Sequence, residues 1–565
     1  MHLPRALAAV LAAAASVGLA AAVVPPAPAA PGAAAPRLTY AVRYVPTVGD
    51  AVIRVEILRD RGYDAQGQPV LLTYSPYNSL GEPEPARDSL AERYVPRGYA
   101  RAVADVLGTR GSTGCWDYGG ANEQQSGVDL VRWLAQRRWS SGRVAMIGGS
   151  YNGTTASMVA ARGGDVPALR AVVPISAISR WYGYAYGNGV RYFLNSEVPS
   201  DEGFDTPLAF DLGFGRTVAA DPMGQHFADT LRSRAAECDT SAHTQEGYSR
   251  HPDYDRFWLR RDYRKDARDF RAAVLLAHGW QDYNVKQQEA TALFRRLRVD
   301  RPGTARVEGV PFKLMYLTQG THSGGTDGRG WQPLLDRFLA HTLKGVGNGV
   351  ESVGPVITQG RDSQGPTRFR TAAGYPLPRT DETTLWLRDG GTLGRRADRS
   401  DGTHVASYTE SGTSTEEART ATGSGPPGGS LYYASRPLSA ATRMVGPAAL
   451  DAWVRPSSET MHLTPVLLDV APNGSTQTIA RGFLNLDYRK GLRTSDPAPG
   501  EWQRARVTML PQDYTVRARH RVALLVQSSN TVWAVPGSPG TVDVATGHVA
   551  AVTPVGSRLV LPTLR

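Results

Sequence analysis

Cysteine is nearly missing from this 565-residue sequence, which contains only Cys115 and Cys238. So few cysteines exclude a small scaffold held by several disulfides, and they exclude a metal site built from clustered thiolates. Two alternatives are left, a single disulfide between Cys115 and Cys238 or two free buried thiols. Export from the cell would favour the disulfide, which would join two different structural units of the chain.

Signatures of nucleotide and nucleic-acid binding are missing as well. The sequence has neither a P-loop nor a dinucleotide-binding fingerprint. Its formal net charge of +11 comes almost wholly from arginine, because only five residues are lysine. The arginines form no dense basic run interleaved with aromatic residues, so we interpret them as a solvated surface and expect no nucleic-acid partner.

Long hydrophobic runs are confined to the N-terminus. Arg5 precedes an apolar, alanine-rich stretch that leads into small residues and prolines. This pattern predicts a secretory signal peptide over residues 1–29, cleaved after Ala29. A membrane anchor is the alternative, but the run is weakly hydrophobic and helix-breaking prolines follow it. We therefore expect a secreted protein without membrane contact after cleavage, and the sequence does not indicate its oligomeric state.

Strand-like and helix-like segments alternate over residues 30–175 and again over residues 266–348. Short apolar runs such as "PVLLTYSPY" and "RVAMIGG" end in turn residues, and "GVDLVRWLAQRRW" has apolar positions at helical spacing. This alternation predicts a mostly parallel sheet covered on both faces by helices. Residues 176–265 interrupt it with a stretch rich in Tyr, Trp, Asp and Arg, which predicts an insertion that caps the active face.

The last part of the chain, residues 349–565, has a different hydrophobic pattern. Short alternating segments such as "LDAWVRP" and "HRVALLVQSS" lie between clusters of Gly, Pro, Ser and Asp, with almost no helical periodicity. This pattern predicts a separate all-β sandwich or jelly roll.

The segment "VAMIGGSYNG" places Ser150 between a short apolar strand and a helix-like run. A serine on such a turn is exposed at the carboxyl end of a sheet, and its neighbours are small because the chain passes close to itself. The backbone NH of Tyr151 and the helix N-terminus would face an oxyanion formed there. Asn152 departs from the common Gly-x-Ser-x-Gly elbow, because Gly153 follows one position late. An ordinary glycine turn is the alternative.

A nucleophilic serine needs a base and a carboxylate that orients the base. In α/β hydrolases these residues follow the serine in the order Asp, His, each at the end of a later strand. Asp282 in "VLLAHGWQDYNV" and His322 in "LMYLTQGTHSGG" meet this expectation. His278 and His341 are interpreted as structural histidines, and a helix cap is the alternative role for Asp282.

The segments "SPY", "GTRGSTGCWDYGG", "GGSYNG", "HGWQDYNV" and "GTHSGG", together with "RVTMLPQDYTVRARHRVALLVQSS", resemble the Xaa-Pro dipeptidyl-peptidase (peptidase family S15) and cocaine esterase superfamily. The resemblance implies an α/β hydrolase core with an inserted, mainly helical cap and a C-terminal jelly roll like that of galactose-binding domains. It accounts for the displaced glycine, since the family's elbow reads Gly-x-Ser-Tyr-x-Gly. It also implies the triad Ser150, Asp282 and His322, with the Tyr77 hydroxyl joining the Tyr151 NH in the oxyanion hole. No cofactor or metal is expected.

The resemblance implies a serine hydrolase that releases N-terminal Xaa-Pro dipeptides through an acyl-enzyme, and the N-terminal segment adds the expectation that it is secreted. Trp181 and Tyr182 are candidates for an aromatic proline pocket, with core packing as the alternative. Acidic candidates for binding the substrate amine are Asp201, Glu202 and Asp205, with a solvated loop as the alternative. Two other functions stay open, an esterase or acylase acting on small acyl compounds and a non-catalytic protein whose β domain binds a glycan.

Overall fold

The computed structural model describes residues 36–78, 84–192, 252–298, 312–398, 403–410, 429–531, 533–549 and 556–565. The predicted signal peptide, Cys238 and the acidic candidates Asp201, Glu202 and Asp205 lie outside the described residues. Within the described part of the chain, no helix is both long enough and apolar enough to cross a membrane.

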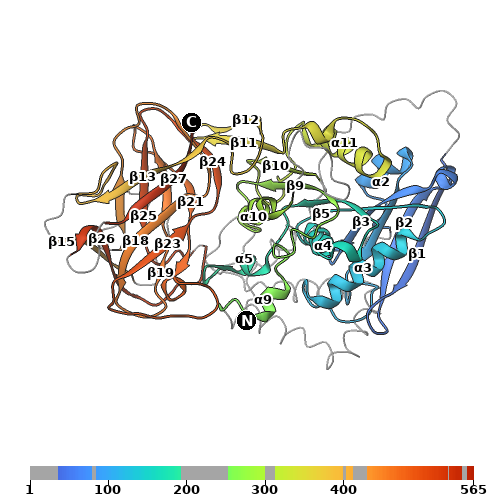
Figure 1. The fold of residues 1–565 in the computed structure, drawn as a ribbon, viewed down its shortest axis with the longest axis horizontal. Helices are drawn as coiled ribbons and strands as arrows, with labels where there is room; N and C mark the ends of the chain where they lie inside the picture. Colours follow the sequence, from blue (N-terminus) through green and yellow to red (C-terminus); the bar gives the residue numbers. More distant parts are fainter. Residues whose placement is uncertain are drawn as a thin grey trace, which may run out of the picture.

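A mostly parallel sheet forms the first large unit, coloured blue to yellow in Figure 1. Neighbouring strands from β4 to β11 are parallel, whereas β2 runs antiparallel to both of its neighbours and β12 antiparallel to β11. In spatial order the strands are β1 (Leu38–Pro46), β2 (Val52–Asp60), β4 (Ala100–Asp105), β3 (Gln68–Ser75), β5 (Ser140–Gly149), β6 (Leu169–Ile175), β9 (Ala273–Gly279), β10 (Lys313–Thr318), β11 (Val356–Asp362) and β12 (Gly365–Ala372).

Helices cover both faces of this sheet. Successive side chains of a strand point to opposite faces, so a strand with apolar residues at every position must be covered on both sides. Along β5, Val144 and Met146 join one hydrophobic cluster, and Ala145 and Ile147 join another. The helices that pack into the first cluster are α3 (Ala121–Ala135), α4 (Tyr151–Ala160) and α10 (Gln288–Arg296). Those on the opposite face are α2 (Ser89–Tyr94) and α11 (Trp331–Lys344). The predicted α/β core is therefore confirmed.

Of the predicted insertion, the structure describes the two ends. The first end contains α5 (Trp181–Ala185) and the short strands β7 (Tyr186–Gly187) and β8 (Val190–Arg191), and the second contains α9 (Arg256–Arg260). Aromatic side chains join the two ends, with ring centroids of Tyr182 and Trp258 5.4 Å apart and both residues fully buried. The cap itself stays a prediction.

The second unit is all-β, drawn in orange and red in Figure 1. Within it β18 pairs with β23, β26 and β27, while β25 pairs with β16 and β20. Side chains from both groups fill one hydrophobic core. Its strands are β13 (Thr380–Arg388), β14 (Thr392–Gly394), β15 (Thr403–Glu410), β16 (Leu431–Ala434), β17 (Thr442–Gly446), β18 (Ala449–Pro456), β19 (His462–Leu463), β20 (Val466–Val470), β21 (Thr476–Arg481), β22 (Leu484–Asn485), β23 (Gln503–Thr508), β24 (Gln512–Val516), β25 (Arg521–Val526), β26 (Gly540–Val549) and β27 (Arg558–Leu564). The all-β prediction is confirmed, whereas the jelly-roll topology stays a prediction.

Two strands that follow the expected boundary at residue 349 pair with the core sheet, and the boundary itself stays a prediction. β11 pairs in parallel with β10, and β12 pairs with β11. At its far end β11 also meets β24 of the β domain, where Arg361 pairs with Tyr514. An alternating sequence predicts a strand but not the sheet it joins, so this continuity between the two units could not be predicted.

Candidate active site

Ser150 lies on a sharp turn between β5 and α4. Its backbone has φ 57° and ψ −125°, a conformation that non-glycine residues rarely adopt. The turn is held by hydrogen bonds: Ser150 N donates to Ile175 O at 2.8 Å, and Gly153 N and Thr154 N donate to Ser150 O at 3.0 Å. Such strain persists only where the surrounding structure enforces it, and it often marks a functional site. The predicted strand–turn–helix elbow is present.

The late glycine of this elbow is explained by close packing. A Cβ on Gly153 would lie 2.7 Å from Gly148 O and 2.9 Å from Ile175 N. Asn152 packs against Gly148, because a Cβ on Gly148 would lie only 2.4 Å from Asn152 Cβ. The tight approach of α4 to the ends of β5 and β6 therefore requires glycine at 153 rather than at 152.

Asp282 and His322 form a hydrogen-bonded pair at the carboxyl ends of β9 and β10. His322 Nδ1 lies 2.9 Å from Asp282 Oδ2, and Asp282 is fully buried. The other carboxylate oxygen accepts hydrogen bonds from the backbone NH groups of Asn284 at 3.1 Å and Val285 at 2.9 Å. These bonds fix the carboxylate, which in turn fixes the orientation of the imidazole.

Electrostatics keep Asp282 ionised. Burial on its own would raise the pKa of this carboxyl, but His322 and His278 together hold the pKa well below its usual range. His278 Nε2 lies 3.3 Å from Asp282 Oδ2 and 2.8 Å from Val285 O. His278 therefore supports the acid, in keeping with its interpretation as a hydrogen-bonded residue at a strand end.

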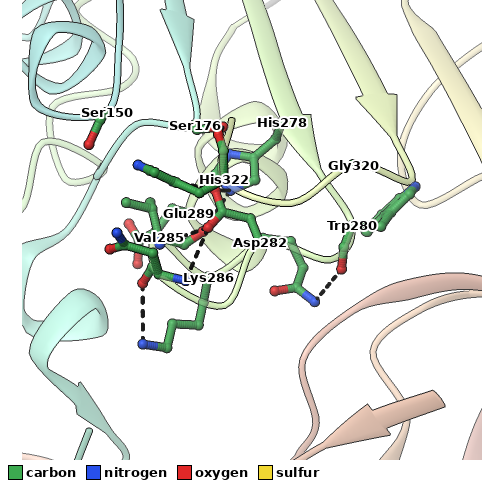
Figure 2. A network of polar contacts seen from close by, with 12 residues as sticks. Ser150, Ser176, His278, Trp280, Asp282, Val285, Lys286, Glu289, Gly320 and His322 are labelled. Carbon is green, nitrogen blue, oxygen red and sulfur yellow. Dashed lines mark hydrogen bonds and ion pairs between the residues drawn. The ribbon is translucent and has the colours of Figure 1, made fainter. Parts of the chain in front are cut away.

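Figure 2 shows His322 between Asp282 and Ser150, with the serine on a separate segment of the chain. The His322 loop is tied to β6, because Ser176 Oγ donates to His322 O at 2.9 Å. The His322 side chain is 20% exposed. The structure thus brings the three predicted triad residues to one end of the sheet, with the acid buried and the base open to solvent.

Tyr77 contacts the nucleophile directly. Its hydroxyl lies 3.3 Å from Ser150 Oγ, and it also forms a hydrogen bond with the backbone NH of Tyr151. Tyr77 is 36% exposed as a whole, but its hydroxyl lies among protein atoms, and this burial raises the pKa of Tyr77 above its usual value. A neutral phenol is a hydrogen-bond donor, so Tyr77 and the Tyr151 NH converge where an oxyanion hole needs two donors.

The side chain of Tyr151 is anchored beneath the elbow by a network that was not predicted. Tyr151 Oη donates to Glu123 Oε2 at 2.8 Å and accepts from Trp116 Nε1 at 2.8 Å. Glu123 Oε2 also accepts from Gly119 N at 2.7 Å, and Glu123 is fully buried. Its pKa is raised to about 8, first by burial and then by Asp117. Nothing in the sequence separates Glu123 from the many exposed acids in first turns of helices.

Trp181 and Tyr182, the candidates for a substrate pocket, are fully buried. Trp181 Nε1 donates to Tyr263 Oη at 3.0 Å, and its ring lies 5.4 Å from that of Tyr151. Tyr182 Oη donates to Pro252 O at 2.7 Å. Side chains without exposed surface favour the core-packing alternative. Tyr184 was not predicted; it is buried beside Trp181, with ring centroids 6.0 Å apart, and its hydroxyl donates to Asn284 Oδ1 at 3.2 Å.

Among the described residues, one group has the side chains to hold a metal ion. Asp389, Asp398 and His404 each place a ligand atom within 4.8 Å of the others. They lie in the β domain, and Asp389 and Asp398 already pair with His404 and Arg388. None of these three residues belongs to the predicted triad. Cys115 is disulfide-bonded, and because Cys238 lies outside the described residues, their pairing stays a prediction.

Two family models match successive parts of this chain. Residues 50–324 match the family model of the X-Pro dipeptidyl-peptidase (S15 family), and residues 348–555 match that of the X-Pro dipeptidyl-peptidase C-terminal non-catalytic domain. A putative Xaa-Pro dipeptidyl-peptidase of Streptomyces avermitilis is 29% identical over 554 residues, which cover 90% of this chain and 75% of the relative.

Solved structures share the fold at low identity. A CocE/NonD family hydrolase from Staphylococcus aureus matches with a TM-score of 0.71 at 18% identity, covering 93% of this chain and 94% of that one. An α-amino acid ester hydrolase matches with a TM-score of 0.70 at 17% identity, covering 96% and 99%.

The strand order, the elbow and the acid–base pair define a serine hydrolase with an α/β hydrolase core and a C-terminal all-β domain. Since both family models match in order along the chain, the protein belongs to the X-Pro dipeptidyl-peptidase (S15) family.

Proposed function

We propose that the protein is an Xaa-Pro dipeptidyl-peptidase that acts through an acyl-enzyme on Ser150. The observation that carries the proposal is the juxtaposition of two pairs, Asp282–His322 at 2.9 Å and Tyr77–Ser150 at 3.3 Å, at one end of the sheet. The relative from Streptomyces avermitilis, named for this activity, supports the choice of substrate.

In the proposed reaction, His322 takes the proton of Ser150 as the hydroxyl attacks the carbonyl carbon of the proline residue. Asp282 stabilises the imidazolium that forms, and Tyr77 with the Tyr151 NH stabilises the oxyanion. His322 then donates its proton to the departing amine, which leaves the Xaa-Pro acyl group on Ser150. Water, deprotonated by His322, attacks this ester and releases the dipeptide.

The same machinery hydrolyses esters, so the decisive experiment compares two substrate classes. We expect Gly-Pro and Ala-Pro anilides to be cleaved by the wild type and not by Ser150→Ala. The matched control is N-acetyl-Gly-Pro anilide, which lacks the free amine and should resist cleavage. Turnover of aryl esters without cleavage of either dipeptide anilide would contradict the peptidase assignment and favour an esterase or acylase.

We further propose that the protein is secreted, on the basis of its N-terminal segment. N-terminal sequencing of protein collected outside producing cells should begin at Ala30. Recovery of the uncleaved chain in the cell interior alone would contradict export.

A further inference from the structure

We propose that Gln512, in β24 of the β domain, is a positioning residue of the active site that holds the loop carrying Asp282. This inference rests on the proposed triad and extends it to a domain whose matching model is described as non-catalytic. It assigns the β domain a direct part in the geometry of catalysis.

Gln512 bonds to the acid loop through both ends of its amide. Its Nε2 donates to Trp280 O at 2.7 Å, and its Oε1 accepts from Gln281 Nε2 at 3.2 Å. Trp280 and Gln281 directly precede Asp282, and Gln512 is only 4% exposed. A buried amide that is bonded as both donor and acceptor fixes the backbone it faces, because leaving either group unpaired costs free energy.

The loop that carries His322 joins the same network. Gln281 Nε2 also donates to Gln319 Oε1 at 3.0 Å, and Gln319 Nε2 donates to Asp513 O at 3.3 Å. Gln319 lies three residues before His322. The acid loop and the base loop therefore both reach adjacent residues of β24.

β24 is itself firmly anchored at this point. The fully buried Asp513 carboxylate accepts two hydrogen bonds from Arg443, at 2.8 and 2.7 Å, and one from Thr358 Oγ1 at 2.9 Å. Thr358 belongs to β11 of the core sheet and also accepts from Trp280 Nε1 at 3.1 Å. β24 thus has fixed contacts in both units, so its hydrogen bonds can hold the two loops in place.

The anchoring of β24 matters because Asp282 and His322 lie on two different loops. Backbone hydrogen bonds also join these loops, from Trp280 N to Thr318 O at 2.8 Å and from Gln281 N to Gly320 O at 3.1 Å, and Gln512 ties the joined loops to the β domain. A misplacement of about 1 Å in a catalytic group can cost on the order of 100-fold in rate. Loss of the Gln512 amide should loosen the acid loop while it leaves the substrate-binding surface intact. The effect should therefore appear in kcat rather than in KM.

The test compares Gln512→Met, which keeps the length of the side chain but removes its hydrogen bonds, with Tyr514→Phe as a matched control. Tyr514 lies two residues along the same strand and donates a buried hydrogen bond to Asp469 at 2.9 Å, within the β domain. We expect Gln512→Met to lower kcat about 10-fold or more with KM within about two-fold. Its rate of labelling by a fluorophosphonate, per folded molecule, should fall in parallel. Tyr514→Phe should lose a similar amount of stability and keep the wild-type kcat.

A folded Gln512→Met variant with wild-type kcat and labelling rate would overturn the inference, and so would an equal loss of kcat in Tyr514→Phe. If Gln512→Met does not fold, Gln281→Met removes the Gln281–Gln512 bond together with the bonds of Gln281 to Gln319 and Tyr283, while the Gln512–Trp280 bond stays. This variant should also lower kcat with little change in KM. The substrate used is whichever the wild type hydrolyses, so a change from peptide to ester leaves the test intact. If the wild type and Gln512→Met are labelled equally fast, the role of Gln512 is contradicted but the triad is not. An unlabelled wild type contradicts the proposed triad as well.

Discussion

The role of Tyr77 as an oxyanion donor depends on its hydroxyl group. Its hydroxyl lies beside Ser150 and the Tyr151 NH, where the oxyanion would form. We expect Tyr77→Phe to lower kcat by about 10²- to 10³-fold, because one of two oxyanion donors is lost, and to change KM little. Steady-state kinetics on the better substrate tests this prediction. An unchanged kcat would show that Tyr77 only packs against the elbow.

Glu123 should make stability depend on pH. Burial raises its pKa to about 8 from an ordinary value of 4.5, so the folded protein keeps a proton that the unfolded chain has released. The stability linked to this proton is complete below about pH 4.5 and is lost as the pH rises towards about 8. Glu123→Gln has no such proton to lose. Its free energy of unfolding, relative to wild type, should therefore increase between about pH 5 and pH 8.

Urea unfolding of both proteins at several pH values measures this difference, and the titrating groups they share cancel. A difference that stays constant from about pH 5 to pH 8, or that falls, would refute the assignment.

Single residues of the site differ in how far the sequence predicts them. Ser150, Asp282 and His322 could be predicted because each stands at a strand end in a fixed order along the chain. Glu123 and Gln512 could not, since their contacts join segments far apart in sequence and their residue types are common on surfaces. For Trp181 the sequence left two roles open, because an aromatic residue near a site is as suited to packing as to binding, and its burial favours packing.

At the level of elements, the elbow between β5 and α4 makes a sharp prediction about glycine. In Gly153→Ala the new methyl group would meet backbone atoms of Gly148 and Ile175 closer than 3.0 Å. We expect a loss of about 1–3 kcal/mol in the free energy of unfolding, with a shift of Ser150 that lowers kcat. Gly149→Ala is the control, because a Cβ there meets nothing within 4 Å. Equal stabilities of the two variants by urea unfolding would contradict this account of the elbow.

Elements were predicted best where periodicity and turn residues agree. The strand expected over 144–147 lies within β5, and the helix expected after Ser150 corresponds to α4, because an apolar run, two glycines and small helix formers all indicate the same turn. β11 and β12 follow the expected boundary at residue 349 and yet extend the core sheet, because their alternating pattern fits a sheet in either unit.

For the whole molecule, the buried ion pair that anchors β24, the strand of the β domain that meets β11 of the core, should be a major source of stability. Arg443 and Asp513 form a bidentate pair in which Asp513 is fully buried. Without the arginine, the buried Asp513 carboxylate loses its opposite charge, so Arg443→Met should lower the free energy of unfolding by about 3 kcal/mol. The exposed pair Arg565–Asp381 is the control, and Arg565→Met should cost less than about 1 kcal/mol. If thermal unfolding shows similar losses for both variants, the buried Arg443–Asp513 pair is not the stabilising contact described here.

The central claim is that Ser150 is the nucleophile of an assembled triad. The most direct measurement is peptide mapping by mass spectrometry after reaction of the folded protein with a fluorophosphonate. A single adduct on Ser150 is expected, absent from Ser150→Ala and formed about 10³-fold more slowly in His322→Ala. A folded wild type that stays unmodified, or an adduct on another residue, would contradict the account.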